Sequence, residues 1–98
     1  MIVLAAKKHK ESEKENAERL AKALEILNGV ADSSTTPRNI HKTVKDIAVA
    51  LEDPEFSVSV RAANAISTLD DLSQDPNMPS YVRVTLWQAV SVLESIRE

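Results

Sequence analysis

The stretch that decides the fold occupies residues 53–79 and reads DPEFSVSVRAANAISTLDDLSQDPNMP. An Asp-Pro pair stands near each end of it, at Asp53–Pro54 and at Asp75–Pro76. Proline is tolerated in the first turn of a helix and breaks a helix interior, so the first pair predicts the start of a helix that runs to about Ser73. Apolar residues recur along it at the spacing of a half-buried helix, at Val58, Ala62, Ala65, Ile66, Leu69 and Leu72.

The chain before this stretch predicts a first helix from about Ser12 to Ala31. The hydroxyl of Ser12 and the carboxylate of Glu15 have the spacing of a capping box, in which each satisfies a free backbone amide. Residues 1–11 are expected to be a flexible or helix-extending N-terminal segment, and residues 12–98 a single four-helix domain. The apolar stripe of this helix is Ala17, Leu20, Leu24, Leu27 and Ala31.

Two further helices begin at prolines. One starts with Thr36 as its cap and Pro37 in its first position, and ends at Asp53. The other runs from Pro79 to Arg97. The first of the two is expected to bury Ile40, Val44, Ile47, Ala48 and Leu51. The second is expected to bury Val82, Leu86, Ala89, Val90, Leu93 and Ile96.

Short connectors join the four predicted helices, so consecutive helices should be antiparallel neighbours. The predicted fold is therefore all-α, a compact four-helix bundle. The chain also partly repeats itself: a shift of 42 residues pairs Pro37 with Pro79 and Thr43 with Thr85. A shift of 22 residues pairs Asp53–Pro54 with Asp75–Pro76 and Val60–Arg61 with Val82–Arg83. Because helix-pair repeats of about 40 to 47 residues are typical of HEAT arrays, a short HEAT-like helical stack is the alternative.

Composition excludes several classes of function. The 98 residues include no cysteine, one glycine and three aromatic side chains, and the net charge is −3. These counts argue against a thiolate metal site, a phosphate-binding glycine loop and a base-stacking platform, so no cofactor and no metal are expected. The apolar run Met1–Ala6 is too short for a secretory signal, and the basic residues follow it where a signal would have them first. No window of the sequence has the roughly 20 apolar residues of a membrane helix. A cytoplasmic protein is expected.

Charge is distributed unevenly. Between Glu55 and Asp70 the only charged residue is Arg61, and between Asp75 and Glu94 it is Arg83. A surface helix normally carries a charged outer face, so these stretches are either central in the bundle or part of an interface with a second copy or another protein. Trp87 fits a core position and an interface anchor equally well. The interface candidates are Val60, Ala63, Val84, Trp87 and Val92.

A basic stripe opens the predicted second helix. Arg38, His41, Lys42 and Lys45 recur at helical spacing near the positive end of the helix dipole, where an anion or an RNA backbone could bind. The alternative is an ordinary solvated face. The negative net charge argues against strong nucleic-acid binding, which usually needs a basic surplus.

No arrangement of residues indicates catalysis. His9 and His41 are the only histidines. Neither has a carboxylate that would orient it for catalysis, or further metal-ligating residues, at a suitable spacing. The acidic residues near the third connector lack the glycine and the terminal glutamate of a calcium loop. We therefore expect a protein that is not an enzyme, with no catalytic residues and no small-molecule substrate in evidence.

The string from Val60 to Pro79 resembles uncharacterised protein family 0147, a family of short archaeal helical proteins. The Thr-Pro-Arg-Asn-Ile start at Thr36–Ile40 and the closing Trp87 and Leu93–Ser95 also fit it. The resemblance covers roughly Leu24 to Ile96. It implies a four-helix bundle from an archaeal cytoplasm and supplies no catalytic residues.

Overall fold

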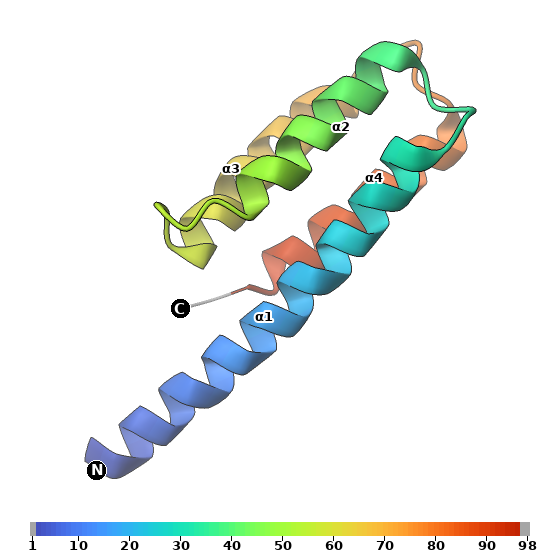
Figure 1. Ribbon diagram of the computed structural model, residues 1–98. Coiled ribbons are helices and arrows are strands. Elements are labelled where there is room, and N and C mark those ends of the chain that lie inside the picture. Colours follow the sequence, from blue (N-terminus) through green and yellow to red (C-terminus); the bar gives the residue numbers. More distant parts are fainter. Residues whose placement is uncertain (1, 97–98) are drawn as a thin grey trace.

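Four helices make up the computed structural model, which describes the backbone of residues 2–96 and the side chains of residues 13–96 (Figure 1). The helices are α1 (Ile2–Asp32), α2 (Arg38–Leu51), α3 (Val58–Leu72) and α4 (Ser80–Glu94). No strand occurs within residues 2–96, so the predicted all-α class is confirmed.

The four helices pack in a closed ring. Each packs against the next in the chain, and α4 returns to pack against α1. This closure makes a four-helix bundle, and the HEAT-like stack is not what the structure shows. Helix α1 has 31 residues and the others 14 or 15, so α1 runs well beyond its partners at its N-terminal end (Figure 1).

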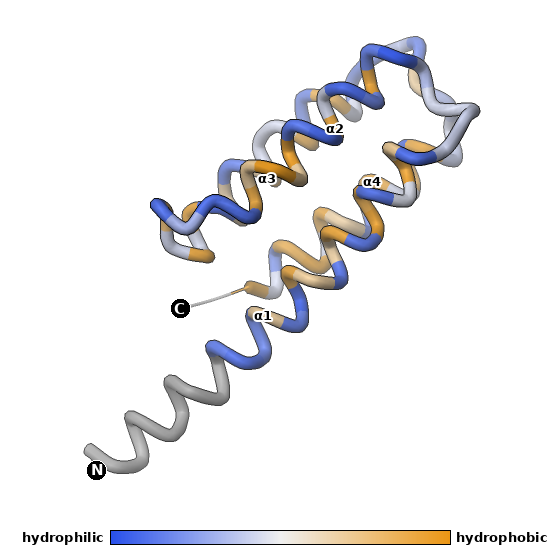
Figure 2. Tube along the Cα trace, viewed as in Figure 1, coloured by the Kyte–Doolittle hydropathy of each residue, from blue (hydrophilic) through white to orange (hydrophobic). Residues whose placement is uncertain are grey.

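The core lies along the bundle axis. Hydrophobic positions recur along every helix in Figure 2, and the largest fully buried side chains come from all four of them. They are Leu27, Ile40, Val44, Leu51, Leu69, Val82, Leu86 and Leu93. The stripe predicted for α2 is confirmed at every position. In α3, Val58, Ile66 and Leu72 only partly enter the core.

The stripe predicted for α1 is wrong at its first residue. Ala17 is exposed, and Asn16 is buried in its place with 3% of its surface exposed. The buried positions continue through Ala23 and Val30, which the predicted stripe omitted. A polar residue therefore occupies an inward position of the helix, and a reading of apolar periodicity passes over it.

The helix starts also differ from the predicted ones. Pro37 and Pro79 are the N-cap residues, one position before the first helical residue. Thr36 does not cap α2, because its hydroxyl donates to the Val30 carbonyl at 2.9 Å and so ties the turn to the end of α1. Helix α1 begins at Ile2, and the expected start at Ser12 lies inside it, because neither proline nor glycine interrupts the residues before it.

Helix α3 begins at Val58 and not at Pro54. The Ser57 hydroxyl accepts a hydrogen bond from the Val60 amide and caps the helix. The Asp53 carboxylate accepts from the Glu55 amide at 3.0 Å, which bends residues 53–55 into a turn. The Asp-Pro pair therefore marks a turn before the helix, and the serine marks the helix start.

The partial repeat at a shift of 42 residues has a structural counterpart in α2 and α4. Both helices follow a proline N-cap. The hydroxyl of Thr43 donates to the Asn39 carbonyl, and the hydroxyl of Thr85 donates to the Tyr81 carbonyl, each four residues back. The repeat therefore lies in how the two helices start and not in a stack of repeated helix pairs.

Candidate interaction surface

The two arginines of the low-charge stretches face the connections between helices. Arg61 donates from Nε to the Phe56 carbonyl at 2.9 Å and from Nη1 to the Leu51 carbonyl at 3.1 Å. Arg83 donates from Nε to the Ser73 carbonyl at 2.9 Å and from Nη2 to a further carbonyl, that of Asp75, at 3.1 Å. The carbonyls of Leu51 and Ser73 stand at the ends of the preceding helices and have no partner within them, and those of Phe56 and Asp75 lie in the connectors. The guanidinium groups are thereby held at the connections.

The same contacts establish which flank of each helix faces which neighbour. Arg83 reaches the α3–α4 connection, so its flank of α4 borders α3, and Trp87 lies one turn further along that flank. Arg61 reaches the end of α2, so the opposite flank of α3, with Ala63, borders α4. Trp87 and Ala63 therefore both lie on the side of the bundle where α3 and α4 are neighbours. Val60 and Val84 lie on the outer ridges of the two helices, opposite their buried positions.

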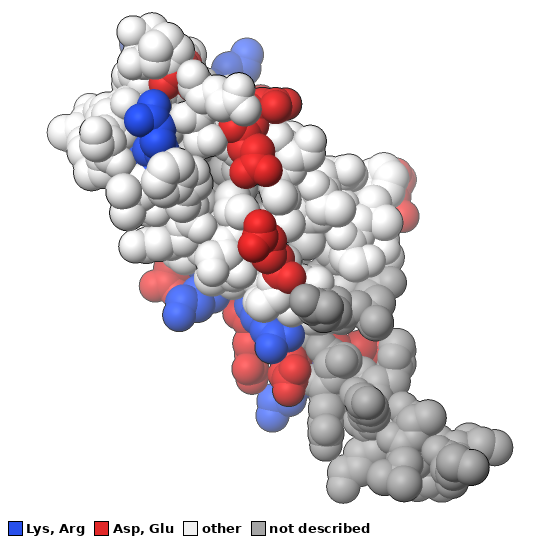
Figure 3. Space-filling view, turned by 180° about the vertical axis from the view of Figure 1, so that it is seen from behind, with Lys and Arg blue, Asp and Glu red and all other residues white. Residues whose placement is uncertain are grey.

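We call Val60, Ala63, Val84 and Trp87 the α3/α4 face. The exposed fractions of Trp87, Val84 and Val60 are 53%, 50% and 43%, and Ala63 is also exposed. In Figure 1, α3 and α4 are the more distant helices, and the view from behind in Figure 3 shows uncharged surface on that side, divided by a row of acidic groups. Trp87 is therefore not a core residue. Val92, the fifth candidate, is partly buried and packs against the core.

The basic stripe divides between two flanks of α2. Arg38, Lys42 and Lys45 are exposed on one flank, opposite the buried positions of the helix. His41 is half-buried on another flank. With Arg38 it borders a shallow depression over the α1–α2 turn, to which Asp32 also contributes. An acidic residue at its edge weakens this depression as an anion site.

The acidic residues near the third connector build a turn. Asp75 accepts from the Asn77 amide at 2.9 Å through Oδ1, and from the Asn39 side chain at 3.3 Å through Oδ2. Within the part of the chain that the structure describes, no group of three or more His, Cys, Asp or Glu residues is placed to hold a metal ion. Among the same residues, no helix combines the length and the hydropathy of a membrane span.

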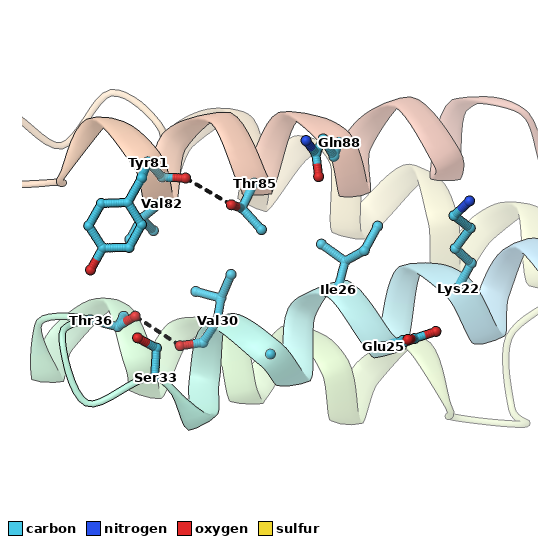
Figure 4. Close-up of a pocket in the computed structure, with 11 residues that line it drawn as sticks. Lys22, Glu25, Ile26, Val30, Ser33, Thr36, Tyr81, Val82, Thr85 and Gln88 are labelled. Carbon is cyan, nitrogen blue, oxygen red and sulfur yellow. Dashed lines mark hydrogen bonds between the residues drawn. The ribbon is translucent and has the colours of Figure 1, made fainter.

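Sequence reasoning missed a groove between α1 and α4, which has a volume of about 410 Å³. Ile26 and Val30 of α1 and Val82 of α4 point into the space between the two helices (Figure 4). Gly29, the only glycine of the chain, lines the groove between them. Tyr81 stands at one end, where its hydroxyl pairs with that of Thr35. The single glycine was the signal for this groove, because glycine is a poor helix former and leaves the helix backbone without a side chain at that position.

Comparison with known proteins supplies the family. The model of the uncharacterised protein family UPF0147 matches residues 7–96. The chain belongs to this family. A UPF0147 protein of the archaeon Metallosphaera sedula is 44% identical over 84 residues, which cover 86% of this chain and 94% of the relative. A UPF0147 protein of Aeropyrum pernix is 42% identical, with 86% and 92% of the two chains covered. The predicted resemblance is thus confirmed.

Two solved structures share the fold. The crystal structure of MMP1188, a protein of unknown function, has a TM-score of 0.80 and 39% identity, and the match covers 84% of this chain and 93% of the other. A UPF0147 protein from Thermoplasma acidophilum has the same TM-score at 26% identity, with 86% and 99% covered. The names of these proteins state no activity, ligand or partner.

Proposed function

We propose that this UPF0147 protein is a small, non-enzymatic, cytoplasmic interaction module that self-associates through the α3/α4 face. The observation that carries the proposal is Trp87, a large apolar side chain left 53% exposed. It lies one turn beyond Arg83 on the same flank of α4, and the Arg83 guanidinium is held by backbone carbonyls. Tryptophan is enriched among the residues that dominate binding energy at protein interfaces.

A second copy is the partner that this face fits best. In a two-fold dimer the same patch meets itself, so a patch with charges of one sign would repel its copy. The chain has a net charge of −3, and the α3/α4 face consists of uncharged residues. These four residues therefore place no like charges opposite one another in a two-fold dimer, and the acidic groups beside them in Figure 3 are the charges that the two copies must keep apart. A standard interface buries about 800 Å² per partner, which is about one eighth of the 6551 Å² surface of this chain.

Sedimentation velocity over a range of protein concentrations tests the proposal. We expect the wild type to form a dimer, and the Trp87→Ala and Val84→Lys variants to shift toward the monomer. Val49→Lys is the matched control, because Val49 is 67% exposed but lies on α2, outside the α3/α4 face. A wild type that stays monomeric at every concentration contradicts self-association. Equal weakening by Val49→Lys would show that the effect comes from added charge and not from the face.

Weak binding of RNA or of a ribonucleoprotein is the second candidate. It rests on Arg38, Lys42 and Lys45, which share one exposed flank of α2. Three phosphate contacts to a single strand predict a slope of about −2 when the logarithm of the binding constant is plotted against the logarithm of salt concentration. A binding constant that does not change with salt concentration, or with replacement of all three residues by glutamine, would contradict this candidate.

A further inference from the structure

Gly29 occupies a place where the fold does not require glycine. It lies inside α1, and glycine is the poorest helix former apart from proline. A Cβ atom built on Gly29 would meet no heavy atom within 4 Å, and no described residue has the positive φ angle that favours glycine. Packing within the chain therefore gives no reason for this residue. Its effect is to leave the α1 backbone bare along one side of the α1–α4 groove.

The groove is closed at one end and polar at the other. At the closed end, Tyr81 of α4 reaches Thr35 in the α1–α2 turn, and their hydroxyl groups pair. At the other end Lys22 rises from α1 toward α4, and Gln88 comes down from α4 (Figure 4). Between the ends Ile26, Val30 and Val82 supply aliphatic surface, and Thr85 of α4 adds a hydroxyl group. A partner helix needs a trough that is open at both ends and about 10 Å wide, so the closed end favours a short molecule.

We infer that this groove binds a small carboxylate with a linear apolar tail. The tail lies over Gly29, between Ile26 and Val82, with its end against the Tyr81 ring. The carboxylate stays at the open end, where the Lys22 ammonium and the Gln88 amide can both donate hydrogen bonds to it. The volume of about 410 Å³ is within the range of small-ligand sites, about 300–1,000 Å³.

The length of the groove sets the length of the tail. Lys22 and Val30 are eight residues apart in one helix, which is about 12 Å at the helical rise. An extended eight-carbon acid is somewhat shorter than this distance, so octanoate is a probe that the groove can hold along its whole length. Glu25 also lines the groove, but Figure 4 shows its carboxylate farther from α4 than the Lys22 ammonium. It opposes a bound anion, and its removal should therefore strengthen binding.

Titration of ¹⁵N-labelled protein with sodium octanoate, followed by NMR, tests this inference. Because the chain has one glycine, a single amide signal reports on the groove at Gly29. We expect that signal, and those of Ile26 and Val30, to shift until they saturate. Octanol has the same tail without the charge and should bind less tightly. Lys22→Gln should weaken octanoate binding about fivefold, the upper range for an exposed ion pair, and Glu25→Gln should strengthen it by up to as much.

Matched leucine variants separate the groove from general apolar binding. Gly29→Leu should fill the groove and abolish saturable binding. Ala21→Leu adds the same side chain to an exposed position of α1 outside the groove and should bind octanoate as the wild type does. Circular dichroism checks that both variants fold, and the Lys22→Gln result stands without them. Shifts on the α3/α4 face in place of Gly29, equal affinity for octanol, or binding that survives Gly29→Leu would each overturn the inference.

Discussion

Replacing Gly29 by alanine should stabilise this protein. Most substitutions destabilise a folded chain, so a gain is an informative outcome. Glycine in a helix interior costs about 0.5–1 kcal/mol relative to alanine, because its backbone loses more freedom on folding. The added methyl group would meet no heavy atom within 4 Å, so no clash offsets the gain. The free energy of unfolding should therefore rise by about 0.5–1 kcal/mol.

The expected change can be measured by thermal unfolding. For a domain of about 100 residues, 1 kcal/mol moves the midpoint by about 4–8 °C, so Gly29→Ala should raise Tm by about 2–8 °C. Circular dichroism at 222 nm follows the loss of helix. All variants must be compared at one protein concentration, because self-association would make the midpoint depend on concentration.

Ala21→Gly provides the reciprocal control. Ala21 is exposed in the same helix, so this change should lower the free energy of unfolding by a similar amount, about 0.5–1 kcal/mol. A destabilised Gly29→Ala variant would contradict this prediction, because overpacking of a filled site costs about 1–3 kcal/mol and would mean that the groove is closed. A neutral result for both variants would show that helix propensity does not limit stability in this part of α1.

Three further predictions concern the contacts that hold the bundle together. Arg83→Lys should lower the free energy of unfolding by about 0.5–1.5 kcal/mol, because one ammonium group cannot reproduce the two hydrogen bonds from the guanidinium to backbone carbonyls. Urea unfolding measures the change, and Arg38→Lys, at an exposed position, is the control. Ser57→Ala should cost about 1 kcal/mol through loss of the α3 cap, and amide hydrogen exchange should quicken in the first turn of α3 before it does elsewhere. Leu86→Ala should cost about 2–5 kcal/mol, because this fully buried side chain leaves a cavity; a smaller loss in urea unfolding would show that the core collapses around it.

The helices could be predicted because their signals are local. Three- and four-residue spacing identified every buried position of α2, and prolines marked the connections. The predicted starts were less accurate, since Asp53 and Thr36 use their side chains in the turns, and Ser57 caps α3. Composition alone does not determine which of several adjacent capping residues accepts the hydrogen bond from the backbone amide of the helix.

Buried residues outside the apolar pattern were missed for a different reason. Asn16 is buried although it is polar, and Met78 is buried although it lies in a connector. Whether such a residue is covered depends on where neighbouring helices end, which is a property of the assembled bundle. The groove depends in the same way on how α4 packs beside α1.

The number of helices, most of their buried positions and the shortage of charge along α3 and α4 could be predicted from the sequence, because these follow from local periodicity and composition. The sequence left Trp87 equally suited to the core and to the surface. Only the tertiary structure decided that question, because the exposure of a side chain depends on which flank of its helix the neighbouring helices cover. Arg83 reaches the α3–α4 connection one turn before Trp87, and on that flank the indole stays half outside the bundle.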